Sequence, residues 1–312
     1  MSDFDIAIPS GVHQLRGTLT TGDSHPGAAV LLISGSGPID RDSNAKRIQI
    51  AVMSQIAAHL ADAGITSLRY DKRGIGESEG EYRSTGLHDN IDDARAALAA
   101  LRARPEVDAD RVFVVGHSEG ALIASALAAD PDLAGVVLLA GAAENGKEVL
   151  RWQARQIAPT LPKPVQLLMK LLRQDIARSQ ARKLERIEAS ADDVIRIQGI
   201  KINAKWHREF MAFDPSQALR RATVPVLAIT GSKDIQVNPA DVSSMEQIVP
   251  TPFVGHVVED VTHLLRSEPG PASLRTYKKQ AKRPLDDRIL AIITDWIATE
   301  SCTTNGAGRD HV

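Results

Sequence analysis

Short runs of consecutive apolar residues recur along the chain and alternate with segments that carry apolar residues at helical spacing. A strand buried on both faces of a parallel sheet shows such a continuous run, whereas a helix with one buried face repeats its apolar residues every three or four positions. The expected strands are residues 28–33, 65–70, 111–115, 135–140, 225–230 and 253–258. The alternation predicts an α/β fold, a mostly parallel sheet flanked by helices.

The expected helices lie between these runs and after the last one. They are marked by Ile48, Val52, Ile56 and Leu60, by Ile91, Ala94, Leu98 and Leu101, by the run 121–129, and by Ile289, Ile292, Ile293, Trp296 and Ile297. Helices of this kind connect neighbouring parallel strands and cover the faces of the sheet.

The alternation stops between Glu144 and Arg220. No strand-like run is recognised there, and helical stripes take its place, as at Val165, Leu168, Met169, Leu172 and Ile176. The segment holds 15 Lys and Arg against 9 Asp and Glu, a net charge of +6 in a chain whose total is −2. The pattern predicts an all-helical insertion, and its charge is compatible with solvated basic faces or with attraction of anionic substrates.

These patterns divide the chain into three parts. We expect residues 1–143 and 221–300 to form one α/β core, and residues 144–220 to form the helical insertion. Residues 301–312 are mostly small and polar, which predicts a flexible tail.

Composition excludes several classes of protein. The net charge of −2 argues against a partner that is a nucleic acid. The single cysteine, Cys302, allows no internal disulfide and no cysteine metal cluster or nucleophile. No apolar stretch reaches the roughly 18 residues of a membrane span, and no secretory signal is recognised, so a cytoplasmic protein is expected. The oligomeric state is not fixed by the pattern, and a homodimer stays open.

The motif Gly116-His-Ser-Glu-Gly120 follows a predicted strand and opens into a predicted helix. A Gly-x-Ser-x-Gly sequence in this setting is the nucleophile elbow, a tight turn that leaves the serine hydroxyl exposed. Because the flanking glycines lack Cβ atoms, the backbone can close around Ser118. The motif predicts that Ser118 is a nucleophile.

An elbow serine needs a histidine as general base and an acid that orients the histidine, in the chain order serine, acid, histidine. Asp234 follows the strand 225–230, and His263 follows the strand 253–258. We therefore expect Asp234 and His263 to complete a triad with Ser118. His256, inside a strand run, and Glu144, after the strand 135–140, are the rival base and acid.

With these residues the chain resembles the α/β-hydrolase superfamily, and more narrowly bacterial serine esterases with a helical lid after the sixth strand. Residues 34–42, Ser-Gly-Ser-Gly-Pro-Ile-Asp-Arg-Asp, match the oxyanion loop of that group, and residues 69–78 match the loop after its fourth strand. Ser34 stands where many members of the superfamily have histidine. The resemblance implies that residues 144–220 are the lid.

The resemblance also implies an oxyanion hole formed by the backbone N–H groups of Ser36 and Glu119. Gly35 and Gly37 would let this loop approach a substrate closely. Arg41 is expected either to brace the loop through ion pairs or to bind substrate.

The predicted function is hydrolysis of a small-molecule carboxylic ester through an acyl-enzyme, without a metal or an organic cofactor. A thioesterase or a peptidase would use the same residues. A protein of this fold that binds a small ligand without catalysis is the alternative from another class.

Overall fold

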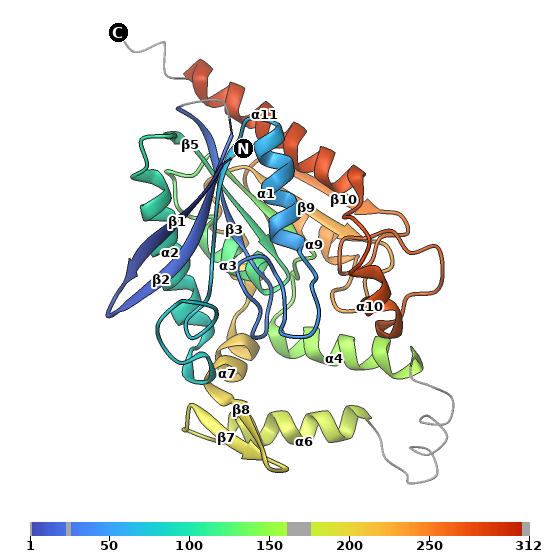
Figure 1. The fold of residues 1–312 in the computed structure, drawn as a ribbon. Helices are drawn as coiled ribbons and strands as arrows, with labels where there is room; N and C mark the ends of the chain where they lie inside the picture. The colour runs from blue at the N-terminus through green and yellow to red at the C-terminus, as the bar shows by residue number, and fades with distance from the viewer. Residues whose placement is uncertain (1, 23–25, 161–175, 308–312) are drawn as a thin grey trace.

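An eight-stranded β-sheet forms the centre of the molecule in the computed structural model, which describes residues 2–22, 26–160 and 176–307 (Figure 1). The strand order is β1-β2-β4-β3-β5-β6-β9-β10. The strands are β1 Ser2–Ser10, β2 His13–Thr21, β3 Gly27–Ile33, β4 Thr66–Tyr70, β5 Val107–His117, β6 Gly135–Leu139, β9 Val226–Gly231 and β10 Phe253–Val258. Every neighbouring pair from β4 to β10 is parallel, so the predicted mostly parallel sheet is confirmed.

Helices cover both faces of the sheet, as predicted. The helices α1 Val52–Asp62 and α11 Asp287–Ala307 pack on one face, and α2 Leu87–Arg102, α3 Glu119–Leu127 and α9 Asp241–Glu246 pack on the other. Each face of the sheet has its own hydrophobic core, and alternate residues of β5 pack into one or the other. Phe113 packs against Trp296 of α11, while Val114 lies in the core on the side of α2. The continuous apolar run of this strand is explained by burial on both sides.

The segment between β6 and β9 contains a β-hairpin, so the prediction that it is all-helical is wrong. It holds α4 Gly146–Ile157, the 3₁₀ turn η2 Ala158–Thr160, α6 Ile176–Glu188, β7 Val194–Ile197, β8 Ile200–Asn203, α7 Ala204–Ala212 and α8 Pro215–Leu219. β7 and β8 pair antiparallel around Gln198 and Gly199, whose φ values of 51° and 81° suit a type I′ turn. The stripe predicted from Val165 to Leu172 lies outside the described residues.

The N-terminus of helix α7 is anchored to the core by hydrogen bonds. The Asn203 side chain donates a hydrogen bond to the carbonyl oxygen of Thr85 at 2.7 Å and caps the helix by accepting from its backbone. Lys205 Nζ lies 2.7 Å from an Asp89 carboxylate oxygen. α7 is thus joined to α2, while α4, α6 and the hairpin lie together at one end of the sheet (Figure 1).

The C-terminal helix α11 continues to Ala307. It thus extends into residues 301–307 of the segment for which a flexible tail is predicted, and residues 308–312 lie outside the described part of the chain. Within the described ranges, no helix combines the length and apolarity that a membrane crossing requires.

Candidate active site

Ser118 lies in the turn between β5 and α3, with φ 58° and ψ −114°. A Cβ on Gly116 would lie 2.0 Å from the carbonyl oxygen of Gly120, and a Cβ on Gly120 would lie 2.1 Å from that of Ile33. Both distances are far below van der Waals contact, so only glycine fits at either position. The packing that encloses the turn holds Ser118 in a backbone conformation that a serine rarely adopts on its own.

Three side chains from distant parts of the chain meet at this turn. Nε2 of His263 lies 3.1 Å from Oγ of Ser118, and Nδ1 of His263 lies 2.8 Å from Oδ2 of Asp234. The other oxygen of Asp234 accepts hydrogen bonds from the backbone N–H groups of Gln236 and Val237, at 2.7 and 2.9 Å. These bonds hold the carboxylate in one orientation and stabilise its charge in a buried position.

The rival residues lie elsewhere. His256 is on the edge strand β10, and Glu144 is exposed at the start of the segment after β6. Neither makes a hydrogen bond to Ser118 or His263 in the part of the chain that the structure describes. The structure thus brings together the serine, the histidine and the aspartate expected from the ends of the strands.

His117 supports the histidine loop. Its Nε2 lies 2.9 Å from the carbonyl oxygen of His263, so Nε2–H donates this bond. Burial, and then the neighbouring His263, lower the pKa of His117 to about 3, so the ring is neutral near neutral pH. The sequence predicted only that His117 packs between strands, because a bond to a backbone carbonyl leaves no mark in a sequence pattern.

Arg266 is fully buried three residues after His263, and sequence reasoning missed it. Its guanidinium donates to the carbonyl oxygens of Leu264 at 2.7 Å, Arg283 at 2.9 Å and Ile50. Burial lowers the pKa of Arg266 to about 10. The guanidinium ties the loop that carries His263 to the segment before α1 and to the segment before α11.

Ser36 and Glu119 both line a cavity beside Ser118. Within the described ranges, no hydrogen bond occupies the backbone N–H of either residue. Glu119 begins α3, and the first N–H groups of a helix have no partner inside the helix. Gly35 lies against the Ser118 turn, where an added Cβ would be 3.4 Å from Ser118 Cβ, and Gly37 has a φ of 94°.

Arg41 braces the loop of residues 34–42. Its Nε and one NH₂ group lie 3.0 and 2.7 Å from Oδ2 of Asp71, and its backbone N–H donates to the other oxygen at 2.7 Å. Asp42 of the same loop binds Nε of Arg69 at 2.5 Å. Arg41 is not among the described residues that line the cavity beside Ser118, so the structure favours the bracing interpretation over substrate binding.

The cavity beside Ser118 has a volume of about 100 Å³ and mostly apolar walls. The rings of Trp206 and Phe210, both from α7, stack in its wall with centroids 4.8 Å apart. The other apolar lining residues are Leu122, Ala140, Ala142, Val149, Leu150 and Val237. Gln153 and Gln236 add uncharged polar groups, and no Lys or Arg occurs among the described lining residues.

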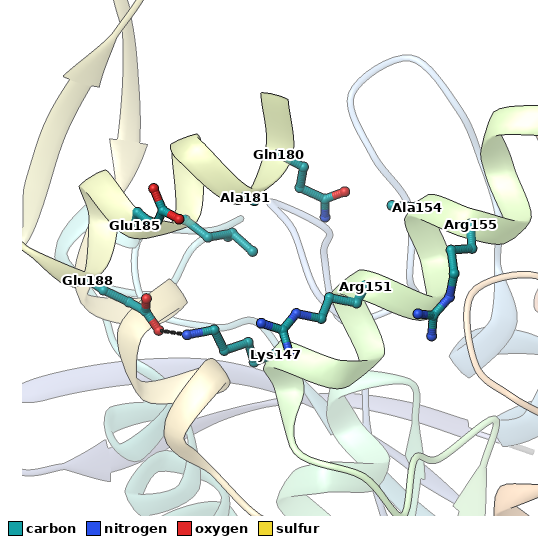
Figure 2. A pocket seen from close by; sticks show the side chains of 9 residues that line it. Lys147, Arg151, Ala154, Arg155, Gln180, Ala181, Glu185 and Glu188 are labelled. Carbon is teal, nitrogen blue, oxygen red and sulfur yellow. Dashed lines mark hydrogen bonds and ion pairs between the residues drawn. The ribbon is translucent and has the colours of Figure 1, made fainter. Parts of the chain in front are cut away.

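The basic residues of α4 face a different cavity. Figure 2 shows Lys147, Arg151 and Arg155 of α4 opposite α6. These residues line a cavity of about 220 Å³. Lys147 pairs there with Glu188 at 2.7 Å. Because these cations lie on the far side of α4 from Val149, the geometry does not support their contact with an anionic group bound at Ser118.

The described residues contain no group of three or more His, Cys, Asp or Glu side chains that could hold a metal ion. The chemistry available at the cavity is that of a hydroxyl next to an imidazole and of free backbone amides.

Ser118 lies at a strained turn between a strand and a helix, and His263 joins it to the buried Asp234. Together with the strand order of the sheet, this arrangement places the chain among the α/β hydrolases. A sequence model described as "Serine aminopeptidase, S33" matches residues 49–270, well over half of the chain. The chain belongs to this family.

Individual relatives agree with the fold. The chain is 30% identical over 282 residues to Esterase EstD of Thermotoga maritima, covering 88% of this chain but only 63% of EstD. The alpha/beta hydrolase GrgF from Penicillium sp. sh18 superposes with a TM-score of 0.65 at 17% identity, covering 97% of this chain and 100% of GrgF. Est1E from Butyrivibrio proteoclasticus, solved with ferulic acid bound, gives 0.62 at 15%, covering 96% and 99%.

Proposed function

We propose that the chain is a serine esterase that hydrolyses carboxylic esters through an acyl-enzyme on Ser118. The observation that carries the proposal is the continuous contact from Ser118 Oγ to His263 Nε2 at 3.1 Å and from His263 Nδ1 to Asp234 Oδ2 at 2.8 Å. Such contacts make a serine hydroxyl nucleophilic near neutral pH. The similarity to EstD, an esterase by its description, supports the same class of substrate.

In the first half of the reaction, Oγ of Ser118 attacks the ester carbonyl carbon while its proton passes to Nε2 of His263. Asp234 stabilises the imidazolium that forms. The carbonyl oxygen becomes an oxyanion, which the N–H groups of Ser36 and Glu119 bind. The intermediate then collapses: the bond to the alkoxy oxygen breaks, and that oxygen takes the proton from Nε2 and leaves as an alcohol.

The second half repeats these steps with water. Nε2 of His263 takes a proton from a water molecule as its oxygen attacks the acyl carbon, and the same two N–H groups bind the new oxyanion. Collapse breaks the bond to Ser118, whose Oγ recovers the proton from His263. The products are a carboxylic acid and the free enzyme.

The cavity walls favour an uncharged, apolar substrate group. A charged group would leave water for a space lined by Trp206, Phe210 and aliphatic side chains, with no opposite charge free to receive it. Glu119 is the one carboxylate among the described lining residues, and its Oε1 already accepts from Asn90 and Trp206. An aminopeptidase would need a carboxylate for the substrate ammonium, so esters are preferred over peptides.

Labelling with a fluorophosphonate probe tests the proposal. Wild-type protein is expected to gain one probe on Ser118, Ser118→Ala none, and Ser243→Ala, which removes an exposed serine of α9, as much as wild type. Wild-type protein that folds but neither labels nor hydrolyses p-nitrophenyl esters would refute the proposal and favour a ligand-binding protein. Faster turnover of aminoacyl p-nitroanilides than of esters would assign a peptidase instead.

A further inference from the structure

Lys72 is a buried lysine beside the oxyanion loop, and the mechanism above does not use it. It follows β4, and only 3% of its surface is exposed. Its Nζ donates a hydrogen bond to the carbonyl oxygen of Gly35 at 2.6 Å. A buried ammonium group is costly, so its place needs an explanation.

The carbonyl that Lys72 binds belongs to the peptide unit that carries the N–H of Ser36. A trans peptide is planar, and its C=O and N–H point in opposite directions. A bond that fixes the Gly35 oxygen therefore fixes the direction of the Ser36 N–H. A positive charge at the oxygen also draws electron density from the amide, which makes that N–H a stronger donor.

Glu119 supplies the opposite charge. Its Oε2 lies 3.6 Å from Nζ of Lys72, and 2% of the Glu119 side chain is exposed. Its Oε1 accepts hydrogen bonds from Nδ2 of Asn90 at 2.8 Å and from Nε1 of Trp206 at 2.9 Å. The carboxylate therefore gives the buried ammonium group of Lys72 a counter-charge.

The ion pair joins the two amide groups assigned to the oxyanion. Glu119 carries one of these N–H groups on its own backbone, and Lys72 holds the peptide that carries the other. Trp206, a residue of α7, holds the Glu119 carboxylate in place, and α7 is itself anchored to the core by Asn203. One buried network thus spans the elbow, the oxyanion loop and the wall of the cavity.

We propose that Lys72 is a positioning residue of the oxyanion hole, which orients and polarises the Gly35–Ser36 peptide, and that the Glu119 carboxylate is its counter-ion. The inference rests on the proposed function, because it concerns the amides that would bind the ester oxyanion. Lys72 is not among the described residues that line the cavity beside Ser118; it acts through one peptide unit.

The first test replaces Lys72 by methionine, which keeps most of the apolar stem and removes the charge. Loss of one oxyanion donor costs about 10²–10³ in kcat, and a donor that is present but misdirected should cost about 10–100-fold, with little change in KM. Affinity for a boronic acid, which mimics the tetrahedral intermediate, should fall by a similar factor. Lys72→Arg should recover part of kcat.

The matched control is Lys147→Met, which removes a lysine charge from the far side of α4 and should leave kcat unchanged. Thermal unfolding of both variants separates a loss of fold from a loss of rate. A folded Lys72→Met protein with wild-type kcat and boronate affinity would overturn the inference and leave the proposed function standing. Wild-type protein without esterase activity would instead defeat the proposed function itself.

A second variant reports on the charge even if Lys72→Met fails to fold. Glu119→Gln keeps an acceptor oxygen for Asn90 and Trp206 but removes the counter-charge. The buried ammonium group of Lys72 then has no counter-charge, which favours its movement away from the Gly35 carbonyl oxygen toward water. We expect kcat of Glu119→Gln to fall together with its affinity for the boronic acid, with little change in KM. A folded Glu119→Gln protein with wild-type kcat and boronate affinity would contradict the proposed role.

Discussion

Replacing Asp234 by asparagine should abolish most of the activity through the tautomer of His263. In the wild type, Oδ1 of Asp234 accepts from the N–H groups of Gln236 and Val237, and Oδ2 accepts from Nδ1–H of His263. Nε2 is then free of a proton and accepts from Ser118. An asparagine must turn its one oxygen to the two backbone donors, so its NH₂ group faces Nδ1.

The NH₂ group of the asparagine can only donate, so Nδ1 of the imidazole must accept its hydrogen bond. Its proton then sits on Nε2, which can no longer take the proton of Ser118. A wrong tautomer of this kind lowers kcat by about 10⁴, which equals about 5.4 kcal/mol in the activation free energy at 1.36 kcal/mol per tenfold. The fold should survive, because the asparagine oxygen still satisfies both backbone donors.

The assay is hydrolysis of a short p-nitrophenyl ester, with kcat and KM measured on protein whose thermal unfolding is recorded in parallel. Asp241→Asn is the matched control: Asp241 is also buried and accepts from the N–H of Ala143 at 3.1 Å, but it does not line the cavity beside Ser118. It should retain wild-type kcat. An Asp234→Asn enzyme that is folded and within tenfold of wild type would refute the tautomer argument.

Three further predictions concern the surroundings of the triad. The pKa of His117 is about 3 in the folded protein and 6.5 in the unfolded chain, so the stability that this group contributes is present above pH 6.5 and is lost as the pH falls. Between pH 7.5 and pH 5 the unfolding free energy of the wild type should fall by about 2 kcal/mol through this group, a loss that His117→Phe should not show when urea unfolding is measured at both pH values. Gly120→Ala, with its Cβ forced to within 2.1 Å of the Ile33 oxygen, should lower the unfolding free energy by more than about 2 kcal/mol and the yield of folded protein, and a wild-type urea midpoint would contradict the steric argument. Val149→Trp should narrow the cavity, so that kcat/KM in a p-nitrophenyl ester series falls far more for long acyl chains than for acetate; an equal fall along the series would place the acyl group elsewhere.

The sheet and the meeting of Ser118, Asp234 and His263 could be predicted because they follow from local patterns. The strand that precedes each of these residues is a short apolar run, and parallel strands end at a common edge of the sheet. Ser118, Asp234 and His263 each follow such a run within five residues, so their meeting could be expected without knowledge of side-chain contacts. The glycines of the elbow could be predicted for the same reason, because Gly116 and Gly120 lie within one five-residue motif around Ser118.

Other features left weaker signals. In the strand β1, the larger apolar residues Phe4, Ile6 and Ile8 stand at alternate positions, but the strand is mostly exposed, so no buried run marks it. The short β7–β8 pair has β-branched residues around Gln198 and Gly199, a turn signal that its helical surroundings hid.

The supporting groups of the site leave no sequence pattern. Lys72, His117 and Arg266 all bind backbone carbonyls. A carbonyl is present at every residue, so sequence spacing cannot tell which of them a side chain will reach. These contacts depend on segments that lie far apart in the chain, and only the folded structure brings them together.

Helix α4 lies between two cavities, since Val149 and Gln153 face the cavity beside Ser118 and Lys147 and Arg151 face the cavity next to α6. The two rows of side chains can therefore change independently. Substitutions in the outer row would alter the charge next to α6, and substitutions in the inner row would alter the shape of the cavity beside Ser118. A single helix thus allows surface charge and cavity shape to change separately.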